Sequence, residues 1–356
     1  MMKKVESSTV RANLITRSLI PENKETPIQF LKDDNISHKL FYRRNHFSYP
    51  NFLTSFYYLP IEGSVYSSKT FSMQEILTFP PKTLKVVLEC AGDKRDLFNP
   101  KVFGEQWEKG AISQGSWKGV PLRTLLQFTG LHADAKEIVV EGYDVGERTD
   151  SNEIVHFSRS LPLEKALDSN TIIAYEYNGY PIPFKHGYPL RLIVPGWYAM
   201  ASVKWIKRIK VIDKKFKGPF QSVDYVYYPH EDNDNESVPV TTINVNSTIQ
   251  KPLDMQILKT GIHEIKGIAW TGVGKITKVD ISLDNGATWN ACQFTSSTEN
   301  HAWTHWSYIW EIKEQGEYTI LIKATDSEGN VQPEKPMWNR KGYGYNAIER
   351  IKVKIE

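Results

Sequence analysis

The chain is poor in cysteine, in long hydrophobic runs and in excess charge, and each shortage argues against a class of protein. Its 356 residues include two cysteines, Cys90 and Cys292, whose wide separation does not suggest a disulfide scaffold. No apolar run has the length of a membrane-spanning helix, so we expect no membrane span. The formal net charge of +3 is too small to give bulk affinity for nucleic acid, and we expect no nucleic-acid partner.

The first residues look like the beginning of a signal peptide but do not continue as one. Two lysines follow the initial methionines, yet residues 5–9 (VESST) are polar and no apolar h-region develops. We therefore expect a cytoplasmic protein. An exported or periplasmic location is the alternative if an N-terminal signal has been removed.

The chain is long enough for two domains, and its shares of hydrophobic (40%) and charged (24%) residues are ordinary for a globular protein. An acidic, polar stretch separates two regions of different texture. We expect a partly loose N-terminal arm at residues 1–24, a first domain at 25–228, a linker at 229–238 and a second domain at 239–356.

Strand-like runs alternate with short helical patches in the first domain, which is typical of a mixed α+β domain rather than a doubly wound sheet. The expected strands are 84–89, 137–140, 171–177, 190–194 and 203–212. The expected helices are 71–78, 121–129 and 162–166.

The second domain consists of short alternating runs separated by turn signals such as Asp284-Asn285-Gly286. Seven such runs over about 120 residues predict an all-β immunoglobulin-like sandwich. The expected strands are 243–246, 263–269, 276–283, 289–294, 307–312, 316–325 and 348–355.

The most informative residue is Cys90, because an apolar strand-like run ends there and a turn of small residues follows. Ala91 and Gly92 leave room for a bulky group near the sulfur. Lys94 and Arg95 would favour the thiolate, the form that binds metal or attacks as a nucleophile. The alternative is a buried structural cysteine, the commoner role of a lone cysteine.

Further segments in a fixed order point to the same site. They are residues 41–46 (FYRRNH), 90–92 (CAG), 110–113 (GAIS), 117–122 (WKGVPL), 186–191 (HGYPLR) and 202–205 (SVKW). Together they resemble the sulfite oxidase family of molybdenum enzymes. The resemblance covers residues 25–356, which is nearly the whole chain.

This resemblance implies a molybdenum-molybdopterin cofactor whose metal is held by two dithiolene sulfurs and by the thiolate of Cys90. Cations, histidines and backbone N–H groups would hold its phosphate, and Asp144 would accept hydrogen bonds from the pterin ring. The family positions that contact the cofactor are here Arg44, Asn45, His46, Cys90, Asp144, His186, Arg191, Ser202, Val203 and Lys204. Without the resemblance, Arg191 and Lys204 would be solvated cations at strand ends. His46 and His186 would be hydrogen-bonded structural residues.

The resemblance also implies a small oxyanion as substrate, held by cations. Arg44 and Arg95 match the oxyanion-facing arginines, since a guanidinium forks well onto a tetrahedral oxyanion. Trp117 matches an aromatic residue of the pocket wall, and a core role for it is equally open. A C-terminal segment would reach back into the site and present Lys341 where the family has an arginine.

Three positions depart from the family pattern, all on the substrate side. Phe216 stands where the family has an active-site tyrosine, and it cannot donate a hydrogen bond. Lys341 replaces a forked guanidinium with a point charge, and Ala201 stands where relatives of the animal enzyme have a cation. The cofactor side carries no such departure, so cofactor binding is the firmer implication and sulfite as substrate the weaker one.

We therefore predict a molybdenum-cofactor oxidoreductase that oxidises sulfite to sulfate by oxygen-atom transfer. The alternatives are reduction of nitrate or a sulfoxide on the same cofactor, and a non-catalytic binding protein on the same scaffold. No Cys-x-x-Cys-His haem attachment site occurs, so we expect a separate electron acceptor, a cytochrome or oxygen. The second domain resembles the dimerisation domain of the family, which implies a homodimer.

Overall fold

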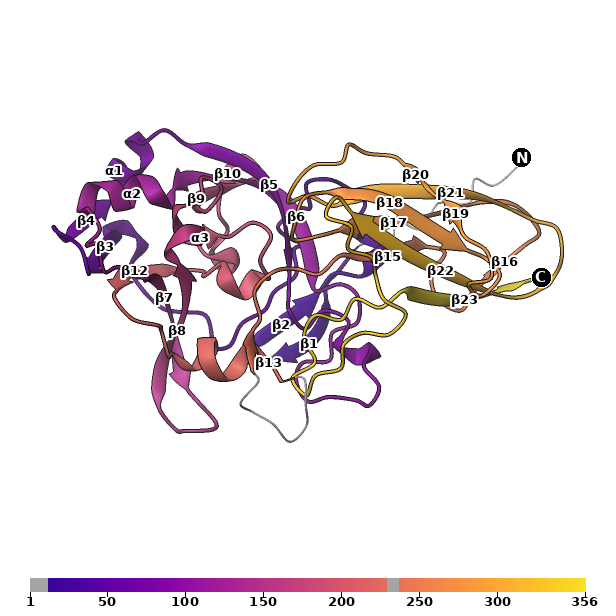
Figure 1. Ribbon diagram of the computed structural model, residues 1–356, viewed down its shortest axis with the longest axis horizontal. Coiled ribbons are helices and arrows are strands. Elements are labelled where there is room, and N and C mark those ends of the chain that lie inside the picture. Colours follow the sequence, from indigo (N-terminus) through magenta and orange to yellow (C-terminus); the bar gives the residue numbers. More distant parts are fainter. Residues whose placement is uncertain (1–11, 229–236) are drawn as a thin grey trace, which may run out of the picture.

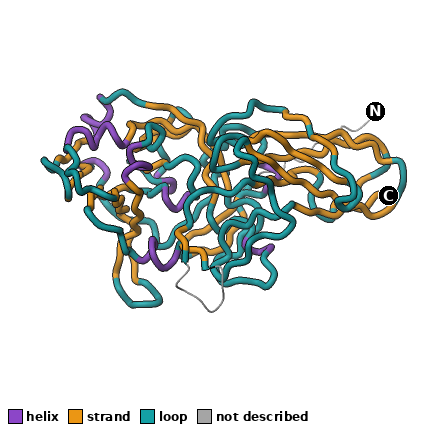
Figure 2. Tube along the Cα trace, in the orientation of Figure 1, coloured by secondary structure: helices purple, strands orange, loops and turns teal. Residues whose placement is uncertain are grey.

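Strands dominate both halves of the chain, and the helices are few and short (Figure 2). The computed structural model describes residues 12–228 and 237–356. The first domain lies beside the second along the long axis of the molecule (Figure 1). Most of the predicted linker, and the first eleven residues of the predicted arm, lie outside the described residues.

A hairpin and two larger sheets build the first domain. The hairpin, within the predicted arm, pairs β1 (Ile15–Leu19) with β2 (Glu22–Glu25). One sheet is antiparallel and has the order β10 (Tyr180–Pro181), β9 (Ile172–Tyr177), β6 (Ile112–Pro121), β5 (Lys82–Glu89). A further strand, β11 (Arg191–Ile193), also pairs with β9. The other, in which β12 runs parallel to β3, has the order β4 (Lys69–Ser72), β3 (Tyr58–Gly63), β12 (Ile206–Ile212), β7 (Glu137–Glu147), β8 (Ile154–Pro162).

Three short helices cover this domain at the places that the sequence predicts. They are α1 (Met73–Thr78), α2 (Leu122–Thr129) and α3 (Leu163–Leu167). A capping box between Ser72 and Glu75 starts α1, and Gly130, with φ at 61°, ends α2. No helix in the part of the chain that the structure describes has the length and apolar character needed to cross a membrane.

The second domain is a sandwich of two sheets, as predicted. One sheet has the order β15 (Asn246–Lys251), β17 (Gly261–Trp270), β21 (Thr304–Ile312), β20 (Gln293–Phe294). The other has the order β16 (Gln256–Leu258), β23 (Glu349–Ile355), β22 (Gly316–Asp326), β18 (Ile276–Ser282), β19 (Asn290–Ala291). A two-residue pair, β13 (Val226–Tyr227) with β14 (Val238–Pro239), connects the domains. The inner faces of the two sheets share a separate core, which includes Trp306 and Ile322.

Two strands differ from their predicted bounds in a way that shapes the site. β12 begins at Ile206 rather than at residue 203, because Trp205 has a φ of 48° and breaks the extended backbone. β7 continues past residue 140 through a bulge, where its register with β8 shifts between Glu141 and Val145. Both irregularities release residues beside the sheet from the regular ladder, and these residues turn toward one cleft.

Candidate active site

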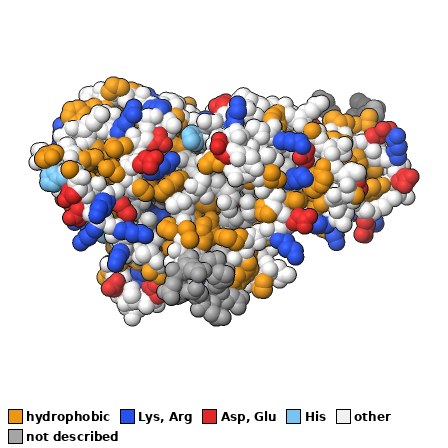
Figure 3. Space-filling view, in the orientation of Figure 1, with side chains coloured by type: hydrophobic (Ala, Val, Ile, Leu, Met, Phe, Trp, Pro, Cys, Tyr) orange, Lys and Arg blue, Asp and Glu red, His pale blue; other side chains and the backbone are white. Residues whose placement is uncertain are grey.

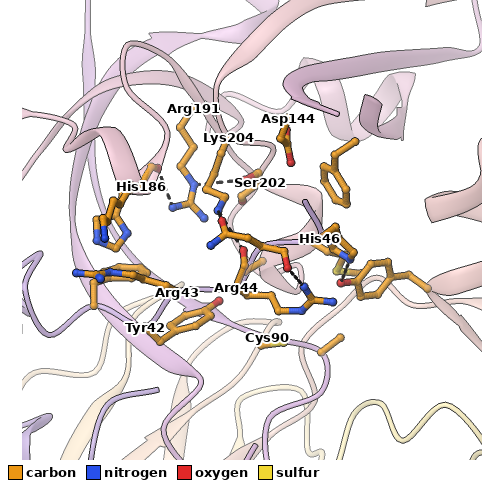
Figure 4. Close-up of a pocket in the computed structure, with 18 residues that line it drawn as sticks. Tyr42, Arg43, Arg44, His46, Cys90, Asp144, His186, Arg191, Ser202 and Lys204 are labelled. Carbon is orange, nitrogen blue, oxygen red and sulfur yellow. Dashed lines mark hydrogen bonds between the residues drawn. The ribbon is translucent and has the colours of Figure 1, made fainter. Parts of the chain in front are cut away.

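Cys90 directly follows β5, which delivers it to a cleft of about 630 Å³, the open space at its mouth included (Figure 4). Its backbone N–H donates to the carbonyl of Ala111 at 2.8 Å, which fixes the turn against β6. Burial raises the pKa of the Cys90 thiol, and the charges of Arg44 and Arg95 oppose this rise. A soft metal cation at the sulfur would favour the thiolate outright.

Lys94 does not act on this thiol as the sequence predicted. Its backbone is left-handed (φ 60°), and its ammonium is buried against the second domain. There Nζ donates to Asn246 Oδ1 at 2.8 Å and to the carbonyl of Ser247 at 2.7 Å, and it pairs with Glu349 at 3.4 Å. The prediction for Lys94 is wrong because a buried carboxylate of the other domain neutralises its charge.

The loop that contains Arg44, Asn45 and His46 forms one wall of the cleft. The backbone N–H of Asn45 donates to Asn23 Oδ1 at 2.7 Å, and its side-chain amide donates to the carbonyl of Glu22 at 2.6 Å. The β1–β2 hairpin therefore fixes this loop. Arg44 directs Nη1 to the carbonyl of Asn45 and faces the cleft.

A second set of cations enters from the opposite wall. Arg191, on β11, donates to the carbonyl of His186 at 3.2 Å and to that of Ser202 at 3.3 Å. Lys204 lies in the segment released before β12, and its Nζ donates to the carbonyl of Arg44 at 3.0 Å. Burial lowers the pKa of Lys204, and the charge of Arg191 lowers it further. The two walls are thus joined by cations that have more positive charge than local carboxylates can match.

Asp144 is the carboxylate of the cleft, and the bulge of β7 places it there. Burial raises its pKa, and the charge of Lys204 opposes that rise. Among the described residues its Oδ1 has no hydrogen-bond partner. A buried carboxylate oxygen without a partner requires a donor, which an N–H of a bound ligand would supply.

Tyr225 brings a hydroxyl to the cleft, 2.9 Å from His46 Nε2. Burial lowers the pKa of His46 well below its ordinary value, and Arg44 adds to this effect. The imidazole is therefore neutral, and its Nε2 shares a hydrogen bond with the Tyr225 hydroxyl. The ring of Tyr225 stacks on Tyr343, from the second domain, at a centroid distance of 5.2 Å.

Phe216, at the sequence position of the family tyrosine, does not line the cleft. It lines a separate groove on the outer face of the sheet, together with Lys214 and Lys217. The chain turns after β12, and the π-helical turn Phe220–Asp224 then carries it back to the cleft. The hydroxyl comes nine residues later, at Tyr225, one of three tyrosines after Phe216, with Tyr227 and Tyr228, that the sequence offers as a substitute.

Arg95 is close to Cys90 but does not line the cleft. Its Nε donates to the carbonyls of Lys341 at 3.2 Å and Gly342 at 3.1 Å, and its Nη1 donates to that of Glu105 at 2.9 Å. Its guanidinium lies 5.0 Å from the centre of the Tyr343 ring. Arg95 therefore links the loop after Cys90 to the C-terminal segment. Its guanidinium does not extend into the cleft to bind an anion.

Three other predicted residues are also absent from the cleft wall. Trp117 is fully buried in the core, where the Arg191 guanidinium lies 5.2 Å from its ring centre, so the core interpretation holds. Lys341 contributes its carbonyl to Arg95, and its charge adds weakly to the effect of Arg148, which lowers the pKa of Asp150. Val203 packs in the core between Ser202 and Lys204.

Two cations of the cleft were missed in the sequence. Arg43 and Lys185 both line it, and both pair with Glu22 on the hairpin, Lys185 at 2.9 Å. Each directly precedes a predicted cleft residue, and this adjacency was the signal available. They extend the positive wall toward the mouth of the cleft.

These residues fit a molybdopterin cofactor. The cations of both walls outnumber the single carboxylate of Asp144, which suits a phosphate-bearing ligand. The open Oδ1 of Asp144 suits the N–H donors of a pterin. In residues 12–228 and 237–356 no three His, Cys, Asp or Glu side chains form a metal-holding group, so a metal beside Cys90 needs ligands from an organic cofactor.

Comparison with known proteins agrees with this reading. The family model of the oxidoreductase molybdopterin binding domain matches residues 46–220, and that of the Mo-co oxidoreductase dimerisation domain matches residues 237–356. Mitochondrial sulfite oxidase of Rattus norvegicus is 33% identical over 94% of this chain. This chain spans only 64% of the length of that relative.

Two further relatives support the same assignment. Sulfite oxidase of Gallus gallus is 30% identical over 90% of this chain and 74% of its own length. The crystal structure of the sulfane dehydrogenase SoxCD from Paracoccus pantotrophus aligns with a TM-score of 0.84 at 26% identity, over 99% of this chain and 93% of that chain. The chain therefore belongs to the sulfite oxidase family of molybdopterin-dependent oxidoreductases.

Proposed function

We propose that this protein oxidises sulfite to sulfate with a molybdenum-molybdopterin cofactor and passes the electrons to a separate acceptor. The observation that carries the proposal is the cleft, where the thiol of Cys90, the guanidinium of Arg44 and the hydroxyl of Tyr225 face one space. Relatives named sulfite oxidase support the choice of substrate.

The residues of the cleft divide the work between cofactor and substrate. Cys90 would supply the one protein thiolate to the metal, and Arg191 and Lys204 would hold the phosphate of the cofactor. Arg44 would hold the sulfite oxyanion, and Tyr225 would keep the neutral imidazole of His46 in place through its 2.9 Å hydrogen bond. The bound cofactor supplies the two-electron oxidation itself.

The overall reaction needs an acceptor and water. Sulfite gains one oxygen atom from water, and two electrons and two protons are released. The cationic walls favour binding of an anionic substrate. A one-electron acceptor would take the two electrons in two steps.

The test combines cofactor content with turnover. Purified protein from a host that makes molybdopterin should contain about one molybdenum and one pterin per chain. It should also reduce ferricyanide when sulfite is added. Cys90→Ser should lose this turnover without unfolding, whereas Cys292→Ser, at the other free cysteine, should retain it. An active Cys90→Ser protein would refute the proposal.

Reduction of nitrate or of a sulfoxide is the alternative reaction, tested with a reduced viologen dye on the same sample. Phe216, which stands where the family has a tyrosine, is the reason to consider this reaction. Tyr225, however, supplies a hydroxyl to the cleft. Faster turnover of either oxidant than of sulfite would replace the proposed reaction.

The match to a dimerisation domain supports a homodimer as the working assembly. Analytical ultracentrifugation should find a mass near twice the 40.9 kDa of one chain. A monomer at micromolar concentration would contradict this part of the proposal.

A further inference from the structure

A second depression, the basic groove, lies on the outer face of the β12–β7–β8 part of the sheet. It holds about 1310 Å³ of space open to solvent. Its apolar floor is formed by Val139, Ile212 and Phe216. Its rim is formed by Arg208, Lys210, Lys214, Lys215 and Lys217, with Glu141 and Ser158 between floor and rim.

The rim retains most of its positive charge. Glu141 pairs with Arg208 at 2.9 Å and with Lys207 at 3.1 Å, so this carboxylate is already shared by two cations. The four lysines of the rim have no ion-pair partner within residues 12–228 and 237–356, and all four are exposed. Figure 3 shows Lys and Arg side chains gathered over this part of the first domain, at the lower left.

The groove and the cleft lie on opposite faces of the same sheet. Neighbouring residues of a strand point to opposite faces. On β8, Phe157 lines the cleft and Ser158 lines the groove. On β12, Lys210 faces the groove, whereas Ile209 packs in the core. One layer of strands therefore separates the groove from the wall of the cofactor cleft.

We propose that the basic groove is the docking face for the electron acceptor, an acidic one-electron carrier protein such as a haem protein with a carboxylate-ringed apolar patch. The inference rests on the proposed function and names its partner. An apolar floor inside a charged rim is the arrangement of protein interfaces, in which apolar contacts give affinity and rim charges steer the encounter.

Electrons balance with two such acceptors. One sulfite and one water yield one sulfate and two protons, and two oxidised acceptor molecules each take one electron. Each acceptor would dock in turn behind the sheet, while the substrate enters on the other face. The sheet thus keeps the substrate and the acceptor from competing for the same opening.

The experiment uses the holoenzyme, sulfite and three acceptors: ferricyanide, a c-type cytochrome of net negative charge and one of net positive charge. The groove variant is Lys214→Glu/Lys215→Glu/Lys217→Glu. The control is Arg123→Glu/Lys259→Glu/Lys335→Glu, which makes the same charge change at exposed cations outside the groove. All three proteins should reduce ferricyanide at similar rates.

With the acidic cytochrome, the unmodified enzyme should lose about tenfold in rate between low and high salt, because screening removes electrostatic steering. The groove variant should be at least about tenfold slower at low salt, and the control should stay within about twofold. Equal rates for variant and unmodified enzyme, equal losses in variant and control, or a preference for the basic cytochrome would overturn the proposal.

Failure of the proposed function has a different signature. If no protein reduces ferricyanide with sulfite, the substrate assignment falls. Binding of the acidic cytochrome to the holoenzyme, measured by calorimetry at low salt, then still tests the groove. Tight binding that is lost in the groove variant but kept in the control variant would support the docking face. Equal binding by the groove variant and the unmodified enzyme would refute it.

Discussion

Replacement of Gly92 by alanine tests whether Arg95 holds the loop after Cys90 in place. A Cβ on Gly92 would lie 2.5 Å from Arg95 Nη2 and 2.6 Å from its Cζ, so the guanidinium must move. The guanidinium has little room to move. The backbone of Gly104 lies so near its Nη1 that a Cβ on that residue would be only 2.9 Å away, and the ring of Tyr343 covers its other side. Displacement would break some of its bonds to the carbonyls of residues 105, 341 and 342.

The cost follows from those bonds. A hydrogen bond to a charged group contributes about 1.5–3 kcal/mol, so loss of two of them predicts about 3–6 kcal/mol of destabilisation. For a domain of this size each kcal/mol lowers the melting temperature by about 2–4 °C, so we expect a fall of roughly 6–24 °C. Differential scanning calorimetry on Gly92→Ala would measure it.

A double-mutant cycle isolates the cause. In an Arg95→Ala background the obstacle is gone, so Gly92→Ala should then cost less than about 0.5 kcal/mol. If Gly92→Ala costs the same with and without the arginine, the clash is not with Arg95. If it costs nothing in the unmodified chain, the guanidinium is not confined and the argument for a tie fails.

Three further predictions concern the cleft and the domain contact. Tyr225→Phe should lower sulfite turnover with ferricyanide about five- to fiftyfold, since His46 loses its hydrogen-bond partner, whereas Phe216→Tyr should leave that turnover unchanged; the reverse pattern would place Phe216 in the site. Lys94→Met should lower the unfolding free energy by about 3–5 kcal/mol in chemical denaturation, because buried Glu349 loses one of its two cations; a change below about 1 kcal/mol would contradict this. Lys204→Gln should reduce the pterin retained after gel filtration, and full retention would remove this lysine from the phosphate site.

Most residues predicted to contact the cofactor line one cleft, and they lie in or beside regular elements. Arg191 occupies a short strand, and His186 precedes it by five residues, so their spacing survives folding. Lys204 could be placed with them because its motif is local. The helices were likewise predictable, since α1 and α2 carry their own start and stop signals.

The substrate side could not be placed in this way, because it depends on the path of irregular chain. Residues 213–225 leave β12, pass the basic groove and return through a π-helical turn, so Tyr225 rather than Phe216 lines the cleft. Lys94 and Arg95 are neighbours in sequence, yet a left-handed backbone at Lys94 sends their side chains to different partners. No local pattern encodes such a choice.

The contacts of the loop after Cys90 show that the second domain supports the wall of the cleft. The carbonyl of Ala91 accepts from the backbone N–H of Gly344 at 2.8 Å, and Lys94 and Arg95 bind groups of the same domain. Tyr343 lies between these contacts and the cleft, where it stacks on Tyr225. A change in how the second domain packs would therefore move both the thiol-bearing turn and the hydroxyl of the cleft. If that domain also pairs two copies of the chain, assembly and cofactor geometry are coupled through residues 91–95, and a dimer-weakening substitution would alter the site without touching it.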